Sequence, residues 1–169
     1  MIYFITGGAR SGKSSYAQAE ALQLSGSPIY VATANVTNDD EFERRVTRHK
    51  NDRDDRWTTI EEPLHVSALP ITDKTVVVDC VTLWLTNFFS RFKYNVEESL
   101  EAIKKEIDLL YSYPGVFLIV SNEIGMGVHA ETEIGRKFTD LQGWANQYIA
   151  EKARKVVLMI SGIPVVIKA

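Results

Sequence analysis

Cysteine is almost absent from this 169-residue sequence, which contains only Cys80. A single cysteine excludes an intramolecular disulfide and a zinc site built from several thiolates, and it suits a reducing compartment. The sequence also lacks an apolar stretch of the roughly 18 residues that a membrane span requires. Its first apolar residues are few and have no basic start, so we expect neither a signal peptide nor membrane insertion. We therefore predict a cytoplasmic protein.

The sequence also lacks an excess of positive charge. Lys and Arg number 19 against 22 Asp and Glu, which gives a formal net charge of −3. No broad basic surface is available for nucleic acid or anionic lipid, so we expect neither as a partner. Hydrophobic residues make up 45% and charged residues 24%, which is ordinary globular composition. The length suits one hydrophobic core, and we predict a single domain spanning residues 1–169.

Short apolar runs alternate with helical patterns along the chain. The runs lie at 2–5, 29–32, 76–78, 116–120 and 156–160. Because they lack polar alternation, they predict strands that are buried on both faces, as in a parallel α/β sheet. Apolar residues at helical spacing predict helices within 17–24, 96–110 and 134–148.

Some single residues refine this prediction. Asn95, with Glu98 three residues later, is expected to cap the second helix. Gly135 and Gly143 weaken the third helix, so we expect close packing at both. The short turn after the fifth strand predicts an antiparallel C-terminal hairpin, and Pro164 places its last strand at a sheet edge.

A phosphate-binding motif follows the first predicted strand and precedes the first predicted helix. It reads Gly7-Gly8-Ala9-Arg10-Ser11-Gly12-Lys13-Ser14 and matches G-x-x-x-x-G-K-[ST]. Its glycines allow backbone N–H groups to surround phosphate oxygens at a helix N-terminus. Lys13 is expected to contact the β and γ phosphates, and the Ser14 hydroxyl to bind Mg²⁺. The motif predicts a P-loop nucleotide-binding protein, but it does not identify the base or the reaction.

A P-loop also needs a carboxylate at the end of a neighbouring strand to hold the metal. Asp79 ends one apolar run, and Glu123 closely follows another. Both are expected at the carboxyl edge of the sheet, where ligands bind in α/β folds. We favour Asp79, because it follows its strand directly. The guanine-specifying Asn-Lys-x-Asp signature of GTPase switches is absent, which disfavours that class.

His49 lies in a segment, 38–56, that is dense in both charge signs. Its spacing places it at the end of an apolar helix face, and the residues alone favour a half-buried structural histidine. The alternative is a nucleophile or proton donor beside a nucleotide. Neighbouring cations such as Arg45 and Arg48 suit phosphate binding and keep an imidazole neutral, and they are equally suited to a lid. His65 and His129 have no metal-ligand spacing, and we interpret both as structural or surface residues.

Taken together, these motifs resemble the bifunctional adenosylcobinamide kinase/adenosylcobinamide-phosphate guanylyltransferase family. The resemblance covers nearly the whole chain and rests on the P-loop and on segments 30–34, 45–61, 78–87, 121–128 and 161–164. It departs from the family at Asp54, where a proline is common, and at His129-Ala130, where Val-Pro is frequent.

The resemblance implies a RecA-like, mostly parallel sheet and two activities. Adenosylcobinamide would be phosphorylated, and adenosylcobinamide phosphate would receive GMP from GTP through His49. Mg²⁺, held by Ser14 and Asp79, would assist, with ATP and GTP as co-substrates. Family members are trimers, so a homo-oligomer is expected. Beyond the P-loop, the implied nucleotide contacts are Thr33, Ala34, Asn35, Lys50, Asn51, Asp52, Arg53 and Glu61. The alternatives are a plain P-loop kinase of small molecules and a RecA-like nucleotide-binding module.

Overall fold

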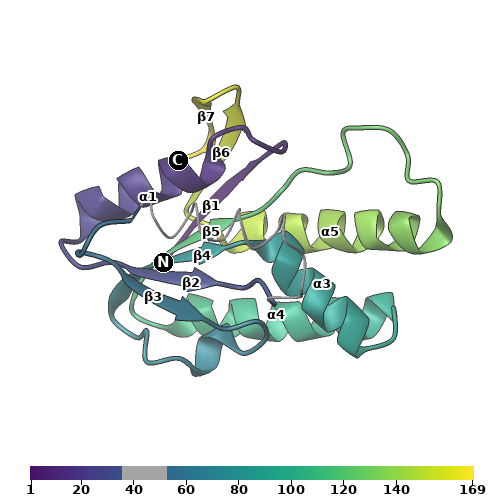
Figure 1. Ribbon diagram of the computed structural model, residues 1–169, viewed down its shortest axis with the longest axis horizontal. Coiled ribbons are helices and arrows are strands. Elements are labelled where there is room, and N and C mark those ends of the chain that lie inside the picture. Colours follow the sequence, from purple (N-terminus) through teal and green to yellow (C-terminus); the bar gives the residue numbers. More distant parts are fainter. Residues whose placement is uncertain (36–52) are drawn as a thin grey trace.

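The computed structural model describes residues 1–35 and 53–169, which form a seven-stranded sheet in the order β3-β2-β4-β5-β1-β6-β7 (Figure 1). All neighbouring strands are parallel except the final antiparallel pair of β6 and β7. The strand bounds are β1 Ile2–Gly7, β2 Ile29–Ala32, β3 Thr58–Glu61, β4 Lys74–Asp79, β5 Gly115–Val120, β6 Lys155–Ile160 and β7 Ile163–Lys168.

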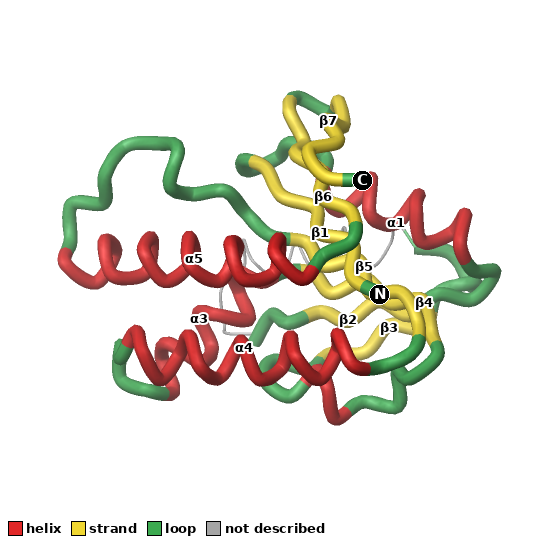
Figure 2. Tube along the Cα trace, turned by 180° about the vertical axis from the view of Figure 1, so that it is seen from behind, coloured by secondary structure: helices red, strands yellow, loops and turns green. Residues whose placement is uncertain are grey.

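Helices cover both faces of the sheet. Helix α1 (Lys13–Leu24) packs on one face against β1, β4 and β5. Helices α3 (Val81–Arg91), α4 (Val96–Ser112) and α5 (Glu133–Lys152) pack together on the other face, with α4 and α5 in front in Figure 2. A short 3-10 helix, η1 (Val66–Ala68), lies beside α4.

The core has two parts because successive strand residues point to opposite faces. Val76 and Val78 of β4 belong to the large cluster under α3, α4 and α5, whereas Val77 belongs to the smaller cluster under α1. Phe117 and Leu118 of β5 divide in the same way. Burial on both faces explains why these strands carry no polar alternation.

The expected fold class is confirmed: a mostly parallel sheet with flanking helices and an antiparallel C-terminal edge hairpin. Asn95 caps α4, since its side chain accepts a 3.1 Å hydrogen bond from the Glu98 N–H. Pro164 lies in the edge strand β7. Strand β3 and helix α3 were not among the predicted elements, and β3 is mostly exposed, so it lacks the apolar run that marked the others.

The expectation of close packing at two glycines of α5 is half right. A Cβ on Gly135 would lie 2.9 Å from the Ala130 Cβ and from the Thr132 hydroxyl oxygen, so that glycine is required where the helix begins. At Gly143 the prediction is wrong, because a Cβ there would meet nothing within 4 Å.

Among residues 1–35 and 53–169, no helix is both long and apolar enough to cross a membrane.

Candidate functional site

The P-loop connects the carboxyl end of β1 to α1 and is built on two unusual glycines. Gly7 has φ 149°, and a Cβ there would lie 2.5 Å from the Met159 carbonyl oxygen. Gly12 has φ 93° and is the N-cap of α1. The turn of the C-terminal hairpin supports the loop from outside, because the Gly162 N–H donates a 3.0 Å hydrogen bond to the Ser11 carbonyl. The N-terminal amides of α1 therefore face the mouth of a rigid loop, which suits an anion.

Lys13 lies folded into this loop. Its side chain is buried, and the ammonium group donates hydrogen bonds to the Gly8 carbonyl at 2.5 Å and to the Ser11 hydroxyl at 3.4 Å. Burial lowers the pKa of Lys13, whereas the charge of Asp79 acts to raise it. The loop thus holds the lysine by hydrogen bonds, within the electrostatic influence of the carboxylate predicted to hold the metal.

Asp79, the last residue of β4, is held by an aromatic residue on the neighbouring strand. The Tyr30 hydroxyl donates a 2.8 Å hydrogen bond to Asp79 Oδ2. Tyr30 is buried in β2, and burial together with the Asp79 charge raises the pKa of its phenol well above the usual value. The phenol therefore remains a hydrogen-bond donor, and it fixes the orientation of one carboxylate oxygen.

The guanidinium group of Arg53 lies over the aromatic ring of Tyr30. Its guanidinium carbon lies 3.9 Å from the centre of the Tyr30 ring, a cation–π contact. Its Nε donates a 3.2 Å hydrogen bond to the Thr59 hydroxyl. Its Nη1 is buried and has no hydrogen-bond acceptor among the described residues. Arg53, Tyr30 and Asp79 thus form a continuous chain of contacts toward Lys13.

Thr33 joins the ends of β2 and β4. Its hydroxyl donates a 2.8 Å hydrogen bond to the Cys80 carbonyl, and its N–H donates one of 3.1 Å to the Asp79 carbonyl. Its own carbonyl accepts a 2.7 Å hydrogen bond from the Asn87 amide on α3. The Thr33 side chain is fully buried, so its role in this geometry is to fix the backbone beside Asp79.

Glu123 follows β5, the strand between β4 and β1, and lies beside the P-loop. Its N–H donates a 3.0 Å hydrogen bond to the Gly7 carbonyl, and its Oε1 accepts one of 2.9 Å from the Gly125 N–H. Ser121, just before it, donates a 2.6 Å hydrogen bond to Asn146 Oδ1 of α5. These bonds attach the loop after β5 both to the P-loop and to α5.

The oxygen ligands at this site suit Mg²⁺. Ser14 offers a hydroxyl at the start of α1 and Asp79 a carboxylate, and both are hard oxygen donors. No group of three or more His, Cys, Asp or Glu side chains that could hold a metal occurs within 1–35 and 53–169. A magnesium ion bound mainly through water and nucleotide phosphates needs only one or two protein oxygens.

The structure gathers most of the predicted residues that it describes at one edge of the sheet, where the parallel strands end. They are Gly7 to Ser14, Thr33, Ala34, Asn35, Glu61, which ends β3 beside Ala32, and Asp79. Arg53 lies instead beside Tyr30 and Thr59, the second residues of β2 and β3. The predictions for His49, Lys50, Asn51 and Asp52 lie outside the described residues.

Sequence reasoning missed the partners that position this set. Tyr30 and Asn87 are the main examples, since each reaches across to a neighbouring element. The available signal was a tyrosine in an otherwise aliphatic buried strand, because a buried phenol usually has a hydrogen-bond partner.

The fold and the loop geometry define a P-loop nucleotide-binding α/β protein. The model of the family "Cobinamide kinase / cobinamide phosphate guanyltransferase" matches residues 3–167. The chain belongs to this family.

Named relatives agree with the family match. The chain is 37% identical to the "Bifunctional adenosylcobalamin biosynthesis protein CobP" of Pseudomonas aeruginosa, over 97% of this chain and 95% of that protein. It is 34% identical to the corresponding protein CobU of Escherichia coli K12, over 99% of this chain and 100% of that protein. Among solved structures, the flagellar accessory protein FlaH of Methanocaldococcus jannaschii shares the fold. Its TM-score is 0.51 at 15% identity, and the match covers 99% of this chain and 77% of that one.

Proposed function

We propose that this protein phosphorylates adenosylcobinamide and then transfers GMP from GTP to adenosylcobinamide phosphate, giving adenosylcobinamide-GDP. Family membership over nearly the whole chain supports the pair of activities. The observation that carries the proposal is the P-loop at the carboxyl edge of the sheet, with Lys13 bonded to the loop and influenced by the charge of Asp79. The protein acts on its substrates in the cytoplasm, where nucleoside triphosphates are available.

In the kinase step, the hydroxyl oxygen of the corrinoid's aminopropanol arm attacks the γ-phosphorus of ATP or GTP. The bond from the γ-phosphorus to the bridging oxygen breaks, the nucleoside diphosphate leaves, and the hydroxyl proton is lost to solvent. Lys13 and the N-terminal amides of α1 stabilise the charge on the transferring group. Ser14 and Asp79 would hold Mg²⁺, which supplies further charge neutralisation on the phosphates when bound.

In the transferase step, an imidazole nitrogen of His49 attacks the α-phosphorus of GTP. A nitrogen–phosphorus bond forms, the bond to the β-phosphate oxygen breaks, and pyrophosphate leaves. A phosphate oxygen of adenosylcobinamide phosphate then attacks the same phosphorus and releases His49. The covalent carrier divides one difficult transfer into two easier ones. Because the nucleophile is neutral imidazole, transfer should decline as pH falls below the pKa of His49.

The remaining nucleotide contacts are proposed around this carrier. Lys50, Asn51, Asp52 and Arg53 would contact GTP, together with the residues after β2 and Glu61. The buried Nη1 of Arg53, which lacks an acceptor among the described residues, supports an anionic partner at that position.

We further propose a homo-oligomer, a trimer by family resemblance. Strand β7 supports this, because its Ile163, Val165, Val166 and Ile167 side chains are all exposed. Light scattering on the purified protein tests it, and a monomeric mass at working concentration would contradict it.

The experiment that tests the central proposal compares two labels. The protein is incubated with Mg²⁺ and GTP labelled at the α-phosphate, and then with GTP labelled at the γ-phosphate. We expect retention of the α-label only, in an acid-labile and alkali-stable bond typical of a phosphoramidate. His49→Ala should abolish it, while His65→Ala, an exposed histidine beside η1, should retain it.

Absence of α-label under conditions where GTP binds would overturn the His49 carrier. Corrinoid-dependent transfer of the γ-phosphate would then identify a plain kinase. Without either transfer, the protein would be a nucleotide-binding module.

A further inference from the structure

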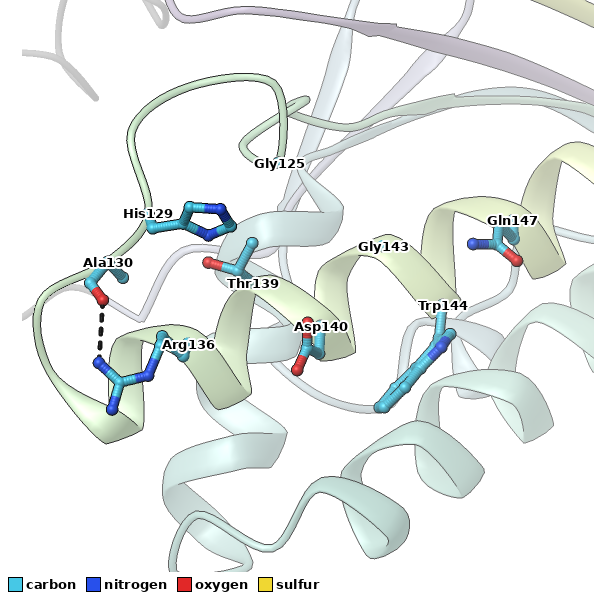
Figure 3. Close-up of a pocket in the computed structure, with 9 residues that line it drawn as sticks. All are labelled: Gly125, His129, Ala130, Arg136, Thr139, Asp140, Gly143, Trp144 and Gln147. Atoms are coloured by element: carbon cyan, nitrogen blue, oxygen red, sulfur yellow. Dashed lines mark hydrogen bonds between the residues drawn. The ribbon is translucent and has the colours of Figure 1, made fainter.

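A pocket of about 380 Å³ lies between the loop after β5 and the first half of α5 (Figure 3). Gly125 and His129 line it from the loop, and Arg136, Gly143 and Trp144 line it from the helix. Figure 3 shows His129 and Arg136 toward one end and Trp144 toward the other. Its volume is within the range of small-molecule sites.

Two hydrogen bonds link this pocket to the P-loop. The Gly7 carbonyl accepts from the Glu123 N–H at 3.0 Å, and Glu123 Oε1 accepts from the Gly125 N–H at 2.9 Å. Gly7 belongs to the P-loop, and Gly125 belongs to the pocket wall. Glu123 therefore joins the pocket wall to the phosphate-binding loop, which the reacting group of an acceptor substrate has to reach.

The pocket wall is held firmly at its base. Gln142 Nε2 donates to the Ser121 hydroxyl at 2.9 Å and to Asn146 Oδ1 at 3.0 Å, and all three side chains are buried. Asn146 Nδ2 also donates a 3.2 Å hydrogen bond to the Asn122 carbonyl. This network fixes α5 to the carboxyl end of β5, so the first half of the helix extends past the sheet edge as a fixed wall.

The charges of the lining do not favour an anion. The Arg136 guanidinium already donates to the carbonyls of Ala130 and Glu131, at 3.2 and 2.7 Å, and so serves to hold the loop. Asp140, also in the lining, adds a carboxylate. Trp144 has 48% of its surface exposed and offers a flat apolar face. This combination suits a large ligand that carries no negative charge and has polar side arms.

Gly143 is the feature that internal packing leaves unexplained. Glycine in a helix interior costs stability relative to alanine. A Cβ at Gly143 would meet no atom of the described protein within 4 Å. The open space lies in the pocket lining, where a ligand can approach the helix backbone closely.

We infer that this pocket binds the corrinoid substrate, taking one edge of the corrin ring with its carboxamide arms. The face of the corrin ring lies against Trp144, and its carboxamide arms form hydrogen bonds with the polar residues of the lining. The aminopropanol arm then extends past Glu123 to the P-loop. This inference rests on the proposed function.

The test measures cobinamide binding by equilibrium dialysis, read from the corrin absorbance. Gly143→Leu fills the open space with a residue that favours a helix, and Trp144→Ala removes the apolar indole face from the pocket. Lys105→Leu and Leu109→Ala, at exposed positions of α4, are the matched controls. We expect about tenfold or greater loss of cobinamide affinity in both pocket variants and less than twofold change in the controls. GTP affinity and α-label retention should not change, and thermal melting confirms that each variant folds.

Equal cobinamide binding by wild type and both pocket variants would overturn the inference while leaving the proposed function intact. A parallel loss of GTP affinity in the pocket variants would also overturn it, because the pocket would then belong to the nucleotide. If wild-type protein neither binds cobinamide nor phosphorylates it, both the inference and the proposed function fail.

Discussion

The Tyr30 hydroxyl donates a 2.8 Å hydrogen bond to Oδ2 of Asp79, and this bond joins β2 to the carboxylate that ends β4. The guanidinium carbon of Arg53 lies 3.9 Å from the centre of the same tyrosine ring. The carboxylate proposed to hold the metal therefore shares a support with a residue proposed to contact the nucleotide. Substitutions at Tyr30 should therefore change the Mg²⁺ requirement of the protein more than they change its stability.

Tyr30→Phe keeps the ring and removes the hydrogen bond to Asp79. We expect a higher Mg²⁺ concentration for half-maximal nucleotide binding, because Asp79 loses its fixed orientation. A hydrogen bond to a charged group contributes about 1.5–3 kcal/mol, so unfolding free energy should fall by no more than that. Titration of Mg²⁺ with nucleotide binding as the readout checks this, with Tyr111→Phe on the exposed face of α4 as the control. An unchanged Mg²⁺ requirement would contradict the positioning role.

Lys13→Met removes the ammonium group from the P-loop while keeping most of the buried side-chain volume. We expect phosphoryl transfer to fall by roughly 100-fold or more, since charge stabilisation of this kind contributes about 2.7–4 kcal/mol. Because burial lowers the pKa of Lys13, replacing it by a neutral side chain should not destabilise the fold strongly. Transfer of labelled γ-phosphate and a denaturation curve test the two parts. Wild-type transfer rates in this variant would exclude Lys13 from the reaction.

Gly7→Ala and Gly8→Ala form a matched pair within one loop. Gly7 has φ 149° and would place a Cβ 2.5 Å from the Met159 carbonyl oxygen, whereas a Cβ on Gly8 meets nothing within 4 Å. We expect Gly7→Ala to lower the unfolding free energy by about 1–3 kcal/mol and Gly8→Ala by less than about 0.5 kcal/mol. Urea denaturation measures both. Equal effects would mean that the loop adapts to a side chain at either position.

Asn146→Ala breaks the buried network that fixes α5 to the end of β5. Ser121 and Gln142 would each lose a partner in a buried environment, which costs about 1–3 kcal/mol of stability. Gln147→Ala, the exposed neighbour, should change stability by less than about 0.5 kcal/mol. Hydrogen exchange in residues 121–132 should become faster in the first variant only. Unchanged exchange there would show that the network does not hold this loop.

Cys80 should be unreactive in the folded protein. The thiol is buried, and burial raises its pKa to about 12. Only the thiolate is a nucleophile, so alkylation by iodoacetamide at pH 8 should be slow until the protein is unfolded. In the folded state the rate should keep rising with pH beyond 9, because the thiol deprotonates only near its raised pKa. Rapid alkylation of folded protein at pH 8 would contradict this assignment.

The sequence by itself determined the fold class and the P-loop. Short continuous apolar runs that alternate with helical patterns are typical of strands buried on both faces. The glycines of the loop are required by its backbone geometry, and its lysine and serine by phosphate and metal binding. Asp79 was predictable for the same reason, because it directly follows such a run.

The tertiary structure decided what supports those residues. The bond from Tyr30 to Asp79 joins residues 49 positions apart, and no local pattern encodes which strands are neighbours. Gly135 and Gly143 look alike in the sequence, yet one contacts Ala130 and Thr132 and the other faces open space. Only the packing of the loop after β5 against α5 separates a glycine required by the fold from one that faces open space.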